Sequence, residues 1–427
     1  MSTATQDRRS LPAAMGDAAT GTVHPGWIPL ALGILGTVAA LLVGSDGSWG
    51  WRLIRVTLVV ALTIGTMRVW AAAGRSGAWT ALAAGSIGLV LGIGFGLGYS
   101  AASAITWKGG LGLTALPSGV ILVAAGTRRL LAGRRPGSRT AITLGLVLVV
   151  ALFVWTVTPA VLATNVPPTS HGTSTPGNYG MTAQEVTFPA SDGTLLWAWY
   201  VPSRNGAAVV LRHGAGSDAS RALPQAQVLA RHGYGVLITD ARGHGLSDGR
   251  AMDFGWYGDA DITGAVSFLA SQPEVNPGRI GALGLSMGGE EAIGAAAADP
   301  RIKAVVAEGA TARTEKDKTW FADVYGLRGR IQLGLEWVQY TLVDLMTEAS
   351  KPTPLASAVE TAGRPIFLIT AGEAPDEGHA AEHLRQRSPG RVNIWTVPGA
   401  GHTQGLSVDP QGWEARVIGF LDSILGR

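Results

Sequence analysis

Apolar positions along this chain form two different patterns, one before about residue 164 and one after it. The first part contains long apolar stretches with few interruptions, over about residues 27–44, 53–73, 78–106, 110–127 and 140–163. Crossing the hydrocarbon core of a bilayer takes about 20 residues of helix, and most of these stretches are long enough. The pattern predicts an all-helical transmembrane region over residues 27–163 with about five spans, after a polar, disordered tail at residues 1–26.

Arginines between these stretches indicate the orientation of the region. With five spans, the arginines within residues 8–9, 68–75 and 128–139 all fall on one side of the membrane, and the other side has fewer Lys and Arg residues. Because Lys and Arg are enriched in cytoplasmic loops, the N-terminus is expected inside and the C-terminal part outside. The sequence therefore predicts a multi-pass protein of the cell membrane with an extracytoplasmic C-terminal domain. The glycine-rich run 88–98 is expected to allow close packing of helices.

After residue 180 the pattern changes to short apolar runs that alternate with helical periodicity. Residues 164–180 are rich in Pro, Gly, Ser and Thr and predict a linker. Residues 185–202 predict two antiparallel strands around a turn at Asp192 and Gly193. Further buried strands are predicted within 207–214, 234–240, 279–286, 302–309, 365–372 and 392–399, and intervening helices at 220–232, 257–271 and 288–298. This alternation predicts one α/β domain over residues 181–427, with a mostly parallel sheet covered by helices.

Composition limits the chemistry that this domain can perform. The chain is 47% hydrophobic and 15% charged, with a net charge of +3 and no cysteine. The lack of cysteine excludes disulfides, thiolate catalysis and cysteine-ligated metals. No basic stripe interleaved with aromatic residues is present, so we expect no nucleic-acid partner.

Two segments match Gly-x-Ser-x-Gly, GLSDG at 245–249 and GLSMG at 284–288. In a chain with 60 glycines the pattern alone is a weak signal, so its surroundings must decide. Ser286 directly follows a predicted buried strand and precedes good helix formers, which is the strand–turn–helix setting of a nucleophile elbow. Ser247 lies in a loop, five residues past the preceding strand. We predict that Ser286 is a nucleophile and that Ser247 is a turn serine satisfied by local backbone.

A serine hydroxyl needs a base and groups that stabilise the oxyanion. His402 follows the last predicted strand in a glycine-rich loop, from which an imidazole can reach Ser286 over the edge of the sheet. His213 directly follows an earlier strand, and its expected role is to shape the turn that presents the Ala215 N–H. The N–H groups of Ala215 and Met287 are the predicted oxyanion hole.

The segments HGAG, DARGHGLSDG, VNPGRIGALGLSMGG and PGAGH, in this order, resemble the alpha/beta-hydrolase superfamily, and most closely its dienelactone-hydrolase and serine-peptidase-like esterase branch. The resemblance covers roughly residues 184–427 and implies the alpha/beta-hydrolase fold with the chain order serine, acid, histidine. It also implies an acid after the strand at 365–372, where this chain has ITAGEAPDEGH with a spacing one residue longer than usual. Asp376 is the first choice for this acid. The alternatives are three glutamates, Glu373, Glu377 and Glu308.

Two further segments bear on the site. Residues 309–360 lie where the family often inserts a lid, and apolar positions from Ile331 onward have helical spacing, so we expect a helical lid over an acyl pocket. The segment HAAEH at 379–383 matches a zinc-protease pattern. No third ligand accompanies it, so we expect no metal and no cofactor.

The predicted function is a membrane-anchored serine hydrolase that cleaves an ester, a thioester or an amide through an acyl-enzyme. Its expected partners are a small acyl-ester or peptide-like substrate and the lipid bilayer. The alternatives are an acyltransferase or serine peptidase on the same triad, or a non-catalytic, membrane-tethered domain that binds a ligand.

Overall fold

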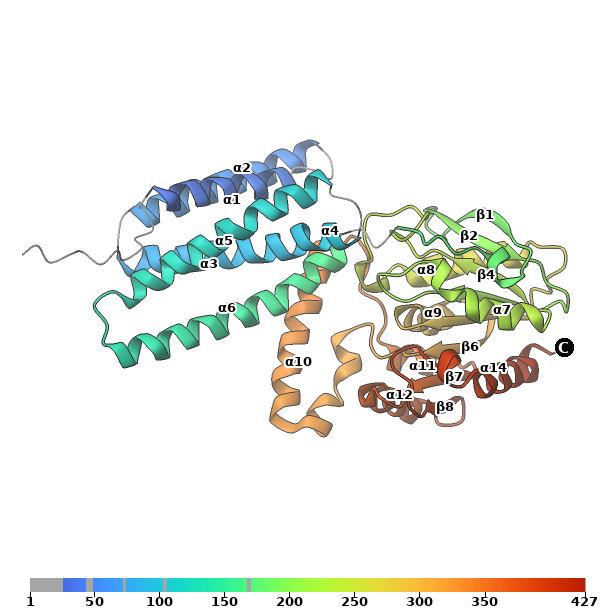
Figure 1. The fold of residues 1–427 in the computed structure, drawn as a ribbon. Coiled ribbons are helices and arrows are strands. Elements are labelled where there is room, and N and C mark those ends of the chain that lie inside the picture. The colour runs from blue at the N-terminus through green and yellow to red at the C-terminus, as the bar shows by residue number, and fades with distance from the viewer. Residues whose placement is uncertain (1–25, 44–48, 72–73, 103–105, 167–169, 427) are drawn as a thin grey trace, which may run out of the picture.

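A computed structural model describes residues 26–43, 49–71, 74–102, 106–166 and 170–426, so nearly all of the predicted tail lies outside the described residues. The chain forms a bundle of long helices followed by an α/β domain (Figure 1). The helices of the bundle are α1 (Trp27–Val43), α2 (Trp49–Ala71), α3 (Arg75–Leu91), a π-helical segment (Gly92–Leu97) that continues into α4 (Gly98–Ala102), α5 (Trp107–Leu131) and α6 (Pro136–Asn165).

Among the described residues, four segments of the bundle are long and apolar enough to cross a membrane. They are Arg52–Ala71, Arg75–Ala101, Trp107–Leu131 and Pro136–Asn165, whereas α1 has 17 residues and is shorter. The predicted apolar stretches are thus helical where they are described, and four of these helices reach a spanning length. The predicted number of about five spans stays a prediction. Because the predicted orientation depended on an odd number of spans, it stays a prediction.

Glycines bring α3 and α5 into backbone contact, as expected for the run 88–98. A Cβ atom added to Gly88 would lie 2.8 Å from the Cα of Gly119, and one added to Gly96 would lie 2.8 Å from the Leu113 nitrogen. No side chain fits in these places. Small residues allow apolar helices to pack closely, and the resulting dispersion contacts stabilise the bundle.

The α/β domain is built on a single eight-stranded sheet in the order β1-β2-β4-β3-β5-β6-β7-β8. Its first two strands pair antiparallel, β2 also runs antiparallel to β4, and the remaining pairs are parallel. This confirms the predicted fold. The strands are β1 (Gln184–Pro189), β2 (Leu195–Val201), β3 (Ala208–Arg212), β4 (Gly235–Thr239), β5 (Ile280–Leu285), β6 (Ile302–Glu308), β7 (Ile366–Ala371) and β8 (Val392–Val397).

Helices cover both faces of this sheet. The helices of this part of the chain are α7 (Leu223–Arg231), α8 (Gly258–Ala270), α9 (Met287–Ala298), α10 (Phe321–Met346), α11 (Leu355–Ala362), α12 (Pro375–Arg387), α13 (Gly405–Val408) and α14 (Pro410–Leu425), with short 3-10 turns at Pro176–Tyr179, Ala219–Ala222, Asp253–Gly255 and Glu315–Lys318. Successive residues of β3 point to opposite faces of the sheet and enter two separate cores. Val210 belongs to the first core, and Val209 belongs to the second. The first core contains residues of α8, α9, α11 and α12, and the second contains residues of α7 and α14.

The segment predicted as a lid contains α10 and α11, which behave differently. Leu355 and Val359 of α11 are buried in the main core. The helix α10 breaks at Gly326, where φ is 55° and ψ is −127°, and then leaves the domain to pack on the C-terminal part of α6 (Figure 1). Only part of the insertion therefore belongs to the hydrophobic core of the α/β domain.

Candidate active site

Ser286 occupies a sharp turn between β5 and α9, the setting predicted for it. Its φ of 53° and ψ of −123° lie in a region that side-chain-bearing residues rarely adopt. Its N–H donates to the Glu308 carbonyl at 2.7 Å. A Cβ on Gly284 would lie 2.1 Å from the Gly288 carbonyl carbon, and a Cβ on Gly288 would lie 2.5 Å from the His213 oxygen. Both flanking glycines are thus required for the close approach of strand, helix and neighbouring turn.

His402 links the serine to a carboxylate. It lies in the loop after β8, with Nε2 2.9 Å from Ser286 Oγ and Nδ1 2.6 Å from Glu377 Oε1. The other Glu377 oxygen accepts the Ala371 N–H at 2.8 Å, which fixes the carboxylate. The hydrogen bond with Glu377 raises the pKa of His402 by stabilising its protonated form, and partial burial opposes this shift. The arrangement places a base between a hydroxyl and a buried carboxylate.

Glu377 therefore takes the place that was expected for Asp376. The side chain of Asp376 is exposed and accepts a hydrogen bond from the Tyr325 hydroxyl of α10, with no contact to His402. Both residues lie in the first turn of α12, where successive side chains point about 100° apart. Glu377 shares the buried face of this helix with Ala380, Ala381 and Leu384, so only its carboxylate faces the sheet.

The other two alternatives have different surroundings. Glu373 is exposed. Glu308 is buried at the end of β6, where it accepts the Gly405 N–H at 2.7 Å and the Trp413 Nε1–H at 2.9 Å. These bonds hold the segment that follows His402 against α14, and burial raises the pKa of Glu308. Glu308 thus supports the histidine loop without contacting the imidazole.

The turn after β3 packs directly against the nucleophile. A Cβ on Gly214 would lie 3.1 Å from Ser286 Cβ. His213 holds this turn, because its Nδ1 lies 2.8 Å from the Gly214 carbonyl and its Nε2 accepts the Ala241 N–H at 2.9 Å. Burial lowers the pKa of His213 far below its usual range, which keeps this buried ring neutral.

Two backbone N–H groups are free to bind an oxyanion here. Met287 is the first residue of α9, so its N–H has no acceptor within the helix. Ala215 follows Gly214 in the turn, and within the described residues neither N–H donates to a protein acceptor. These are the two groups predicted for the oxyanion hole.

Ser247 has the turn role predicted for it. Its hydroxyl donates to the Asp240 carbonyl at 2.8 Å and accepts the Trp197 N–H at 2.9 Å, which ties the loop to β2. The nearby His244 is buried rather than lining an opening, and its Nδ1 lies 2.9 Å from the Arg242 carbonyl. Neither side chain points to a reacting group.

A buried ionic cluster beneath the elbow was not expected from the sequence. Arg212, at the end of β3, pairs with Asp261 at 2.7 Å and with Glu291 at 2.5 Å. Burial raises the pKa of Glu291 to about 7, although Arg212 acts in the opposite direction. The cluster joins β3, α8 and α9, the elements that surround the Ser286 turn. One signal in the sequence could have indicated this cluster: the apolar run AAVVLRHG contains a charged residue, Arg212, which needs a buried partner.

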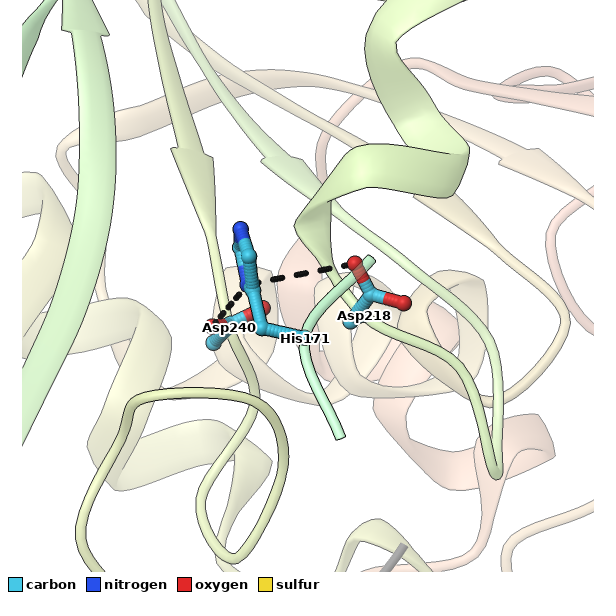
Figure 2. A group of neighbouring side chains, drawn as sticks. All are labelled: His171, Asp218 and Asp240. Carbon is cyan, nitrogen blue, oxygen red and sulfur yellow. Dashed lines mark hydrogen bonds and ion pairs between the residues drawn. The ribbon is translucent and has the colours of Figure 1, made fainter. Parts of the chain in front are cut away.

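A second cluster, formed by His171, Asp218 and Asp240, joins the linker to the domain (Figure 2). His171 Nδ1 is 3.0 Å from Asp240 Oδ2 and 3.9 Å from Asp218 Oδ1, the one group within the described residues with the spacing for a metal ion. Both Asp240 oxygens and one Asp218 oxygen already accept backbone N–H groups. The His171 ring also packs edge-on against Trp197 and Trp199. These contacts explain the cluster as an attachment of the linker.

The zinc-protease pattern on α12 also has another explanation. The His379 ring lies 5.4 Å from the Trp320 ring, within an aromatic group that includes Tyr325 and Phe321. The two histidines of HAAEH are not among the described residues that cluster with the spacing of metal ligands.

The α/β domain is similar to known hydrolases. A family model described as serine aminopeptidase, S33, matches residues 203–355, which include Ser286. A thiohydrolase of Aspergillus aculeatus is 35% identical over 136 residues, which is 31% of this chain and 43% of the thiohydrolase. An uncharacterised protein of Mycobacterium tuberculosis is 28% identical over 246 residues, 56% of this chain and 77% of that protein.

A solved structure, an esterase of Pyrococcus furiosus, aligns with a TM-score of 0.49 and 24% identity, covering 62% of this chain and 99% of the esterase. The chain thus spans less than half of the thiohydrolase's length. The sheet order, the turn at Ser286 and the family match agree: the C-terminal domain of this chain has the alpha/beta-hydrolase fold, and residues 203–355 match the serine aminopeptidase family model.

Proposed function

We propose that this protein is a membrane-anchored serine hydrolase whose catalytic triad is Ser286, His402 and Glu377. The observation that carries the proposal is one continuous chain of contacts, 2.9 Å from Ser286 Oγ to His402 Nε2 and 2.6 Å from His402 Nδ1 to Glu377 Oε1. A hydroxyl, an imidazole and a carboxylate in this order are the three groups needed to activate a serine.

The reaction follows from the positions of these groups. Ser286 Oγ attacks the carbonyl carbon of the substrate while His402 Nε2 takes the hydroxyl proton. The N–H groups of Ala215 and Met287 stabilise the negative charge that develops on the carbonyl oxygen. Glu377 holds the Nδ1–H and stabilises the imidazolium. His402 then protonates the leaving group, and a water molecule hydrolyses the acyl-enzyme by the same steps with His402 again as the base.

We propose an ester or thioester as the scissile bond, since a thiohydrolase is among the relatives. An aminopeptidase activity is the second candidate, because the matching family model carries that description. The two are distinguished by comparing kcat/KM for thioesters and esters with kcat/KM for aminoacyl amides. A preference for amides at equal acyl length would favour the second candidate. Adding an alcohol or amine acceptor to the same assay tests for acyl transfer.

Catalysis is favoured over the alternative of a non-catalytic binding domain, because Glu377 provides a carboxylate in contact with His402. For the membrane part, the four long apolar helices support an integral location. We propose the cell membrane, with the hydrolase domain outside, as the loop arginines predict.

Labelling with a fluorophosphonate probe tests the catalytic proposal. Wild-type protein should be labelled, Ser286→Ala should not, and Ser247→Ala should be labelled because its hydroxyl is bonded to the backbone of its own loop and β2. Loss of labelling in a folded Ser247→Ala variant, with labelling retained in Ser286→Ala, would refute the proposal.

A membrane-impermeant probe, applied to intact and to permeabilised cells, tests the orientation separately. Labelling only after permeabilisation would put the domain inside.

A further inference from the structure

The helix α10 carries an apolar stripe that the protein leaves uncovered. After the break at Gly326, the side chains of Leu327, Ile331, Val338 and Leu345 are 75%, 59%, 38% and 77% exposed. Their spacing of four, seven and seven residues puts them on one face of the helix. The buried residues of α10, which include Gly329, Tyr340 and Val343, lie on the other side. A contiguous exposed apolar face of this kind marks a surface that contacts a partner or a membrane.

The stripe lies at the level where α6 approaches its C-terminal end. Tyr340 and Val343 of α10 pack with Ala160 of α6, and the Met346 sulfur accepts a hydrogen bond from Thr164. Figure 1 shows that α10 runs crosswise to α6, with one end of α10 against the C-terminal part of α6. If α6 spans a bilayer, a helix crosswise to it at this level lies along the membrane surface. Trp155 of α6, which is 75% exposed at the same level, is a residue type enriched in that interface.

Polar groups beside the stripe suit a lipid headgroup region. Arg328 and Arg330 are exposed and flank the apolar face on its two sides. Arg328 also lines a cavity of about 530 Å³ between α10 and α6, together with Ile331 of the stripe, Gln332, Gln339 and Trp155. Interfacial helices typically border an apolar face with basic residues whose stems lie over the acyl region while their charges reach the headgroups.

We propose that α10 is an interfacial helix whose Leu327–Leu345 stripe enters the surface of a phospholipid bilayer. The proposal rests on the membrane location proposed above for α6 and is independent of catalysis. It has one consequence for the site. Tyr325, just before the break, donates a hydrogen bond to Asp376, which adjoins the carboxylate that contacts His402. The lipid contact of α10 is thus connected to the helix that holds Glu377.

The chain has no cysteine, so an introduced one is a unique attachment point. Full-length Leu327→Cys, Val338→Cys and Leu345→Cys are labelled with an environment-sensitive fluorophore and reconstituted into phosphatidylcholine–phosphatidylglycerol vesicles. Asp344→Cys is the matched control, because Asp344 is exposed on α10 beside the stripe. A far-UV circular dichroism spectrum like that of wild type verifies the fold of each variant.

If α10 lies in the interface, quenching by spin-labelled acyl chains should be at least about twofold stronger at the three stripe positions than at Asp344, and quenching by aqueous iodide should be weaker. Equal iodide quenching at all four positions would overturn the proposal. Shielding of the stripe from both quenchers would also overturn it, because protein would then cover the stripe. If alkaline carbonate extracts the protein from the vesicles, the membrane location itself fails, and this result is distinct from a failure confined to α10.

Discussion

The segments around Ser286 and Ser247 contain the same five-residue pattern, but the two serine hydroxyls have different partners. In the first, the backbone turns abruptly from β5 into α9, and Oγ lies 2.9 Å from an imidazole nitrogen. In the second, the hydroxyl donates to the Asp240 carbonyl and accepts the Trp197 N–H. The Ser247 proton and one of its lone pairs are therefore used for structure, whereas Ser286 meets a base.

Each serine also has a histidine in its vicinity, and the two histidines differ in the same way. His402 is half exposed, and its hydrogen bond with Glu377 raises its pKa. His244 is buried, and this burial lowers its pKa to about 4. The comparison teaches that a nucleophile needs a base whose charged form is stabilised by a carboxylate. A serine and a histidine that are close in sequence do not provide this.

The largest expected effect comes from removing that carboxylate. Glu377→Gln should lower kcat/KM for an ester by roughly 10³–10⁴, because an amide neither stabilises the imidazolium nor enforces the Nδ1–H tautomer. Steady-state hydrolysis of a chromogenic ester by the purified full chain measures this. Asp376→Asn is the matched control, since it alters only the exposed contact with Tyr325 and should stay close to wild type. A larger loss in Asp376→Asn would show that the adjacent carboxylate is the acid.

The next largest effect is expected from a substitution in the tightly packed turn at Ser286. Gly288→Ala should destabilise the hydrolase domain by about 3 kcal/mol, because its Cβ would lie 2.5 Å from the His213 oxygen and 2.7 Å from the Arg212 oxygen. Chemical unfolding, followed by loss of tertiary signal, measures the change. Gly419→Ala is the control, since its Cβ would meet nothing within 4 Å on α14, and it should stabilise the domain by up to about 1 kcal/mol. Equal stability of the two variants would contradict the packing of the elbow.

The setting of Ser286 could be predicted from sequence because its signals are local. An apolar run, a glycine on each side of the serine and helix formers after it all lie within residues 279–298. The acid was harder to identify because two carboxylates are adjacent and family spacing pointed to Asp376. Their positions on the helix would have distinguished them. With the helix beginning at Pro375, Glu377 lies on the same face as the apolar residues Ala380, Ala381 and Leu384, and this face is buried.

Other features depend on contacts between distant parts of the chain. Arg212 pairs with Asp261 and Glu291, which lie 49 and 79 residues away, and no local pattern specifies those partners. The departure of α10 from the domain depends on one unusual conformation at Gly326 and on the surface of α6. Periodicity predicted the α10 helix correctly but could not predict where the helix packs.

A smaller effect is expected at the second serine. Ser247→Ala should destabilise the domain by about 1–2 kcal/mol, because the Trp197 N–H and the Asp240 carbonyl each lose a partner. Thermal unfolding measures the loss, and labelling by a fluorophosphonate should persist below the new midpoint. A variant of unchanged stability that no longer reacts with the probe would show that the hydroxyl serves the reaction instead of the fold.

The smallest effect is a displacement of the pH profile. Hydrolysis requires neutral His402, so kcat/KM should rise with pH through the pKa of this residue. The hydrogen bond with Glu377 stabilises the protonated ring, and the midpoint should therefore lie above the ordinary value of 6.5. In Glu377→Gln the residual activity should reach half its maximum at a lower pH than in wild type, because the stabilised imidazolium is lost. His244→Gln should leave the midpoint in place, since a group with a pKa of about 4 stays neutral over this range. A midpoint that is unchanged or higher in Glu377→Gln would mean that another group controls the charge of His402. The difference in pKa between His402 and His244 would then have to be explained by burial alone.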